Sequence, residues 1–144
     1  LGKSSRFHTS LIKKQKLFSE INAFISGSFD EGLFTITGKL LDHVSFEDAE
    51  KAIIKEIEKI KTTLVSDDEL IKVKNKTEST SQFSETSVLN KAMNLSFAEL
   101  LGNANDVNLE VEQYQKVTAE DINKVANEIL VATNCSTLIY SKKK

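Results

Sequence analysis

The fold is decided by residues 19–40, which read SEINAFISGS, then FDE, then GLFTITGKL. In the first run Ile21, Ala23 and Ile25 alternate with other side chains, and the second run alternates in the same way. A period of two is typical of a strand that buries one face. Two such runs joined by a short segment with Gly and Asp predict an antiparallel β-hairpin. We expect helices to cover its buried face.

The segments that follow predict mainly helices. Ser45, Ser66 and Thr118 are each followed three residues later by an acidic residue, which is the pattern of a helix N-cap. Apolar residues three or four positions apart give the helix after Ser45 one buried stripe. Residues 66–102 predict either one long helix with a weak centre near residues 78–82 or two helices, ended by Gly102.

Three further segments complete the expected architecture. A helix is expected from Ser4 to about Leu17, and a short helix near residues 106–114. Residues Cys135–Ser141 alternate in the manner of a final strand. The fold class is therefore expected to be α+β, with the antiparallel hairpin and the C-terminal strand in one sheet packed by several long helices. We expect residues 1–144 to form a single domain.

Composition excludes some classes of partner. The net charge is −2 and charged residues are 28% of the chain, so the basic patch of a nucleic-acid-binding protein is not expected. No apolar run approaches the roughly 20 residues that span a bilayer, so no membrane partner is expected. The single cysteine fits a reducing compartment, and we expect a cytoplasmic location. The chain begins with Leu1, as an excised fragment would.

The residues that could carry chemistry are few and scattered. A zinc site needs closely spaced ligands, and the two histidines, His8 and His43, have no second ligand at a zinc-binding spacing. Cys135 opens the expected strand and should be a buried, inert thiol. The carboxylates of Asp67–Glu69 should serve the first turn of a helix. We therefore predict no catalytic, cofactor-binding or metal-binding residue in this chain.

Several stretches together resemble the pitrilysin/insulinase family of zinc metallopeptidases, the inverzincins. The resemblance lies in the order and spacing of a G-x-S-S-R opening, a G-L-F-x-I strand, two capped helix starts and a V-T-A-E-D-I segment. They correspond to Gly2–Phe7, Gly32–Ile36, Ser45–Ile57, Ser66–Asn75 and Val117–Ile122. Together they cover most of the chain.

The resemblance implies two homologous α+β halves that close around a peptide, with an H-x-x-E-H zinc motif in the active half. This chain lacks that motif, so it is expected to be the later part of the C-terminal, non-catalytic half. Its partners would be the missing N-terminal half, which would hold the zinc, and the peptide substrate, which this chain would help enclose and position. Where many members of the family anchor the substrate with Arg and Tyr, this chain has Ile12 and Ser19. We therefore assign no substrate-anchoring residue of the family to this chain.

Two other interpretations remain open. The chain is alternatively a non-catalytic structural or peptide-holding relative of the same fold, or an unrelated α+β interaction domain whose helix caps match by chance. In either family interpretation the hairpin has lost neighbouring strands. An open sheet edge favours pairing with another chain, so we expect self-association into a homo-oligomer.

Overall fold

The computed structural model describes residues 2–27 and 30–141. The chain divides into two compact units. Unit 1 comprises residues 1–62 and 128–144, and unit 2 comprises residues 63–127. The expectation of a single domain over residues 1–144 stays a prediction.

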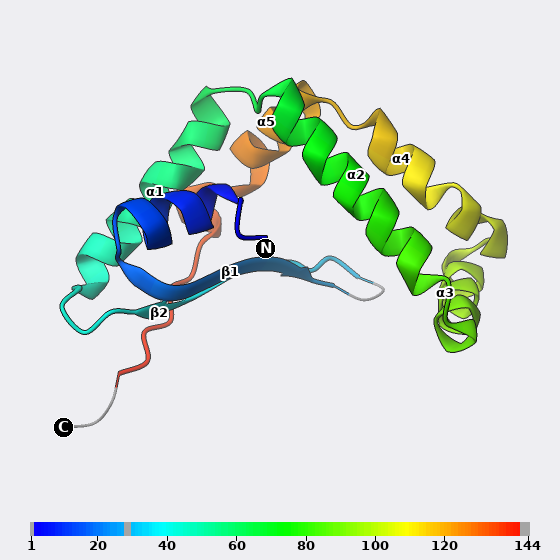
Figure 1. Cartoon of the computed structure of the whole chain (residues 1–144), viewed down its shortest axis with the longest axis horizontal. Coiled ribbons are helices and arrows are strands. Elements are labelled where there is room, and N and C mark those ends of the chain that lie inside the picture. Colours follow the sequence, from blue (N-terminus) through cyan, green and yellow to red (C-terminus); the bar gives the residue numbers. More distant parts are fainter. Residues whose placement is uncertain (1, 28–29, 142–144) are drawn as a thin grey trace. The chain divides into compact units, whose positions relative to one another are not determined.

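Unit 1 is built on the expected hairpin, which is confirmed. Strands β1 (Phe18–Ser26) and β2 (Leu33–Leu40) pair antiparallel (Figure 1). Ile21 lies opposite Gly38, and Ile25 lies opposite Phe34. The register shifts between Phe18 and Glu20, where the ladder is irregular. The turn expected at residues 29–31 begins at Phe29, which lies outside the described residues.

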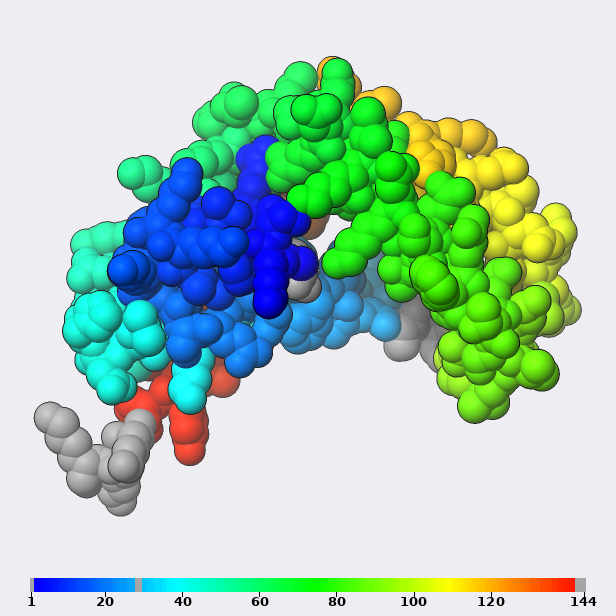
Figure 2. Space-filling view, viewed as in Figure 1, coloured from blue at the N-terminus to red at the C-terminus, as the bar shows by residue number. Residues whose placement is uncertain are grey.

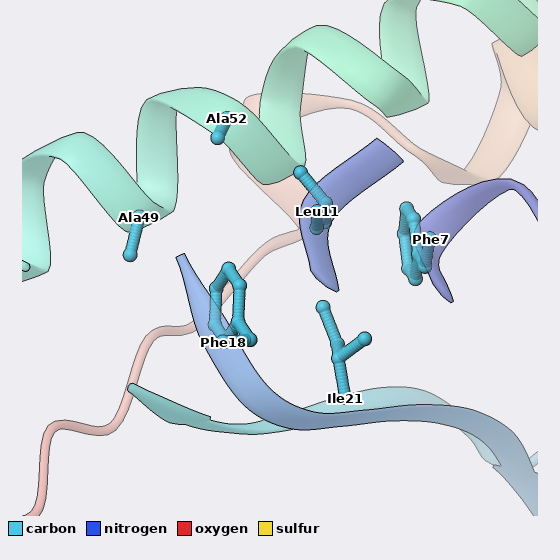
Figure 3. Packing of buried hydrophobic residues seen from close by; sticks show 6 residues of the cluster. All are labelled: Phe7, Leu11, Phe18, Ile21, Ala49 and Ala52. Atoms are coloured by element: carbon cyan, nitrogen blue, oxygen red, sulfur yellow. The ribbon is translucent and has the colours of Figure 1, made fainter. Parts of the chain in front are cut away.

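Two helices cover one face of this hairpin and form the core with it. Helix η1 (His8–Lys14) is a π-helix, and α1 (Phe46–Thr62) is the long helix predicted after Ser45. Figure 2 shows the atoms of η1, in dark blue, directly against those of β1. Figure 3 shows the core side chains converging from the N-terminal segment, β1 and α1. The core consists of Phe7, Leu11, Phe18, Ile21, Ala49 and Ala52.

The predicted strand over Cys135–Ser141 is wrong. After the short helix η3 (Ala132–Asn134), the backbone at Cys135 is extended, but among the described residues the sheet holds β1 and β2 alone. Leu138 is 95% exposed, and the segment's contact with α1 is a hydrogen bond from Thr137 Oγ1 to Glu50 Oε1 at 2.9 Å. A strand needs a neighbouring backbone to pair with, and alternation in sequence does not supply one.

Unit 2 is helical, and the two-helix alternative for residues 66–102 is confirmed. Helices α2 (Asp67–Ser84) and α3 (Val88–Leu101) are separated at residues 85–87, where Ser87 caps α3. Gly102 ends α3 with a φ of +136°, a conformation that favours glycine.

The remaining elements of the chain are shorter. Helix η2 (Ala104–Asn108) and helix α4 (Glu110–Lys116) follow α3, and α5 (Ala119–Ile129) leads from unit 2 back to unit 1. Two hydrogen bonds join α2 to α4, from Lys74 Nζ to Gln115 O and from Gln115 Nε2 to Glu78 Oε2. No helix among residues 2–27 and 30–141 is long and apolar enough to cross a membrane.

The three predicted N-caps are confirmed by their hydrogen bonds. Ser45 Oγ accepts from the backbone N–H of Asp48 at 3.1 Å, and Ser66 Oγ accepts from that of Glu69 at 3.3 Å. Thr118 and Asp121 form a complete capping box. Thr118 Oγ1 accepts from the backbone N–H of Asp121, and the backbone N–H of Thr118 donates to the carboxylate of Asp121 at 2.9 Å. These caps satisfy backbone donors that would otherwise lack an intrahelical partner.

Candidate functional site

The two histidines lie on different elements, His8 on η1 and His43 in the turn before α1. The backbone N–H of His8 donates to Ser5 Oγ at 3.3 Å, and its Nδ1 is buried without a hydrogen-bond partner among the described residues. His43 lies exposed in the turn before α1. Across the part of the chain that the structure describes, no group of three or more His, Cys, Asp or Glu could hold a metal ion. The ligands of a zinc site are therefore not gathered at any one place among these described residues.

The remaining sequence candidates have ordinary surroundings. Asp67–Glu69 form the first turn of α2, as predicted, where their charge suits the helix dipole. The prediction that Cys135 is buried is wrong, because its thiol is exposed and free. The expected burial depended on a strand that does not form here.

Sequence reasoning missed a buried polar cluster that joins η1 to α1. Glu56 is only 3% exposed, and its Oε1 accepts hydrogen bonds from Ser10 Oγ at 2.6 Å and from Lys59 Nζ at 2.5 Å. Gln15 Nε2 donates in turn to Ser10 Oγ at 3.0 Å. Glu56 lies four residues after the buried Ala52, on the apolar stripe of α1. A charged residue placed among apolar residues three or four positions apart is the sequence signal that could have revealed this cluster.

The cluster stabilises the charged form of Glu56. Burial raises the pKa of this carboxyl, but the hydrogen bonds from Lys59 and Ser10 and the positive charges of Lys59 and Arg6 outweigh burial, so its pKa lies below the ordinary value of 4.5. A general acid near neutral pH needs a raised pKa, so this carboxylate does not suit that role. Its geometry instead ties the N-terminal helix to α1.

The outer end of the hairpin exposes large apolar side chains on the surface of unit 1. Ile21 is buried on the face that points to the core, and the pair Ala23–Ile36, next along the same face, is partly buried. The pair Ile25–Phe34 continues this face but is exposed, with Ile25 at 75%. We name these four residues, Ala23, Ile25, Phe34 and Ile36, the distal hairpin face. The core-facing side of the hairpin thus extends beyond its helical cover.

The comparisons with known proteins agree with this fold. Residues 1–77, which hold η1, the hairpin and α1, match the family described as the peptidase M16 inactive domain. This chain belongs to the M16 peptidase inactive-domain family. The family resemblance seen in the sequence is confirmed. A search of curated proteins found no match.

Solved structures show how widely the fold of this inactive domain is shared. A protease from Helicobacter pylori matches with a TM-score of 0.84 at 22% identity, over 92% of this chain and 32% of that one. A candidate zinc protease from Bordetella pertussis matches with a TM-score of 0.80 at 22% identity, over 92% of this chain and 72% of that one. The inactive peptidase domain of a candidate zinc protease from Bordetella parapertussis gives a TM-score of 0.80 at 21% identity, over 91% of this chain and 71% of that one. The chain thus spans about a third of the length of the H. pylori protease.

Ile12 and Ser19 both make contacts within unit 1. Ile12 lies on η1 and packs against the core. Ser19 lies on β1, where its Oγ donates to the backbone oxygen of Lys39 at 3.1 Å. Neither offers a cation or a phenol to a peptide.

Proposed function

We propose that this chain is the C-terminal portion of a zinc-dependent metalloendopeptidase and helps to enclose and position the peptide substrate without being catalytic itself. The observation that carries the proposal is the match of residues 1–77 to the M16 inactive domain. In this proposal the other half of the parent protein holds the zinc and hydrolyses the peptide, and it is the partner of this chain. The protease chains that share the fold are longer than this one, which agrees with such a division.

The distal hairpin face supplies the contacts that positioning needs. An extended peptide can pair its backbone with an open sheet edge and place alternate side chains against the face of the sheet. Ile25 and Phe34 offer an exposed apolar surface beside such an edge. Because these contacts are apolar, we expect them to hold substrate and transition state about equally and to affect binding more than chemistry.

The test compares the intact parent protein with its pieces. Hydrolysis of a fluorogenic peptide is measured for the parent, for the parent without residues 1–144, and for the two pieces mixed. We expect activity from the parent and the mixture only. Within the parent, Phe34→Ser should raise KM with little change in kcat, and Leu138→Ser, at an exposed site away from the hairpin, should change neither. Full activity of the parent without residues 1–144 would refute the proposal.

A second candidate is a structural or peptide-holding relative without peptidase activity. Ile12 and Ser19 favour it, because Ile12 packs against the core and the Ser19 hydroxyl bonds across the hairpin, so neither presents a cation or a phenol to a peptide. The zinc content of the parent separates the two functions. A parent that binds peptide without zinc and without hydrolysis is a peptide-holding protein, whereas zinc-dependent hydrolysis supports the first proposal.

A further inference from the structure

Positive charge is concentrated in residues 1–16. This segment holds five of the 19 Lys and Arg residues of the chain and no Asp or Glu. The remaining residues carry 14 Lys and Arg against 21 Asp and Glu, a net charge of −7. An asymmetry of this kind points to a local surface on which an anionic partner binds.

The π geometry of η1 decides where its lysines point. A π-helix is bonded from residue i to i+5, so side chains four and five positions apart lie on the same side. Phe7, Leu11 and Ile12 have this spacing, and all three pack in or against the core. In an α-helix the core side would recur about seven residues after Phe7, at Lys14. The π-helix therefore keeps Ile12 on the core side and turns Lys14 away from it.

Three lysines at the end of η1 form an exposed cationic surface. Lys13 and Lys14 occupy the last turn of the helix on the side away from the core, and both are exposed. Lys16 follows the helix, is exposed as well, and turns the backbone at a φ of +53°. None of the three makes an ion pair with another residue that the structure describes. We name Lys13, Lys14 and Lys16 the η1 lysine patch.

Contacts with the rest of unit 1 fix this patch in place. Ser10 Oγ donates to Glu56 Oε1 on α1 at 2.6 Å, and Gln15 Nε2 donates to Ser10 Oγ at 3.0 Å. The charge of Glu56 is buried and paired with Lys59, so it is not available to the patch. A surface held in this way loses little conformational freedom when a ligand binds.

The number of lysines favours a short anionic partner. Firm binding of duplex DNA takes roughly six to ten phosphate contacts, and juxtamembrane recognition of anionic lipids takes clusters of about four to eight Lys and Arg. The patch offers three lysines, and the negative charge of the remaining residues repels an extended polyanion. A short acidic segment of a peptide needs only the patch itself.

The place of the patch relates it to the hairpin. Figure 1 shows η1 leading directly into the start of β1, whereas the distal hairpin face lies toward the other end of that strand. Among the described residues β1 pairs with β2 alone, so its second edge has no strand partner. β1 is nine residues long, which corresponds to about 30 Å. An extended peptide of similar length would span the distance from the distal hairpin face to the patch.

We propose that the η1 lysine patch binds acidic side chains of the peptide substrate, so that the preferred substrates carry Asp or Glu near one end of the bound segment. This inference rests on the proposed function, because it takes the substrate as the occupant of the patch. The contacts are charge pairs on an exposed surface and therefore weaken as the salt concentration rises.

The test measures hydrolysis of matched peptides by the intact parent protein. Fluorogenic peptides of about 16 residues carry Asp-Asp near the N-terminus, Asp-Asp near the C-terminus, or Asn-Asn at both places. We expect one of the Asp-Asp peptides to have a KM about fivefold below that of the Asn-Asn peptide, with a similar kcat, from two exposed charge pairs. The preference should disappear in the double variant K13Q/K14Q and in about 0.5 M NaCl.

The control variant removes the same amount of charge elsewhere. Lys72→Gln and Lys76→Gln together change two exposed lysines on α2, in unit 2, and should leave the preference intact. Far-UV circular dichroism checks that both double variants are folded. A preference that survives in K13Q/K14Q, or that is lost equally in K72Q/K76Q, would overturn the assignment of the patch.

The outcomes separate this inference from the proposed function. A parent that hydrolyses all three peptides with the same KM would overturn the inference and leave the proposed function standing. A parent that hydrolyses none of them would count against the proposed function, and fluorescence anisotropy of the same labelled peptides would then decide whether the patch prefers the acidic ones. Binding of duplex DNA or phosphatidylserine vesicles that K13Q/K14Q abolishes, without any preference among the peptides, would assign the patch to another partner and refute the proposal.

Discussion

Replacing Leu11 with alanine should remove a large part of the stability of unit 1. Leu11 is 0% exposed and lies among Phe7, Phe18 and Ile21 (Figure 3). Its loss leaves a cavity lined partly by aromatic rings, which cannot collapse into the space without leaving their own contacts. Comparable leucine deletions cost about 3–5 kcal/mol, and we expect about 4 kcal/mol here. Whole domains are stable by only about 5–15 kcal/mol.

The assay is urea and thermal unfolding followed by far-UV circular dichroism. For a chain of 144 residues, a loss of that size lowers the melting temperature by about 10 °C. Leu138→Ala is the matched control, because it makes the same chemical change at a 95% exposed position and should stay within about 0.5 kcal/mol of the parent sequence. If Leu11→Ala cost less than about 1 kcal/mol, or no more than Leu138→Ala, the packing of η1 against the hairpin and α1 would be wrong.

Three further predictions concern single contacts. Gly38→Ala should destabilise the chain by about 1–3 kcal/mol in urea unfolding, because its new Cβ would lie 2.7 Å from the buried ring of Phe18; an unchanged midpoint would contradict the close contact. The pKa of Glu56 is lowered on folding, so its stabilisation is complete above the ordinary pKa of 4.5 and disappears as pH falls through the lowered value. In a plot of melting temperature against pH, Glu56→Gln should therefore reduce the fall of melting temperature on the acid side. An unchanged fall would contradict the lowered pKa of Glu56. Thr118→Ala should cost about 1 kcal/mol by removing a helix cap, and Thr137→Ala, away from any helix start, should cost less.

Most of the fold could be predicted from patterns within short stretches of sequence. The hairpin could be predicted because its alternation and its turn are both encoded within residues 19–40. The helix starts could be predicted because a cap is a contact between residues three apart, as at Thr118 and Asp121. The choice between one helix and two over residues 66–102 needed the structure. The break came at residues 85–87 rather than in the weaker tract at residues 78–82.

What the sequence could not supply were contacts between distant residues. The sequence from Cys135 to Ser141 has the alternation of a strand, but pairing depends on a neighbour that the segment itself does not encode. Ser10 and Glu56 form a hydrogen bond although 46 positions separate them, so the sequence near Ser10 does not predict it. Ile25 reads as core from its period, yet it is exposed because the helical cover ends before it. In each case the outcome depends on which distant segment lies beside the residue in the folded chain.

The proposed function requires that zinc be held in another part of the parent protein. The most direct test is zinc measured by mass spectrometry in the intact parent and in the 144-residue chain purified in the same way. We predict about one zinc per parent molecule and less than about a tenth of that in the chain alone. A parent without zinc, or stoichiometric zinc on the 144-residue chain, would contradict the claim.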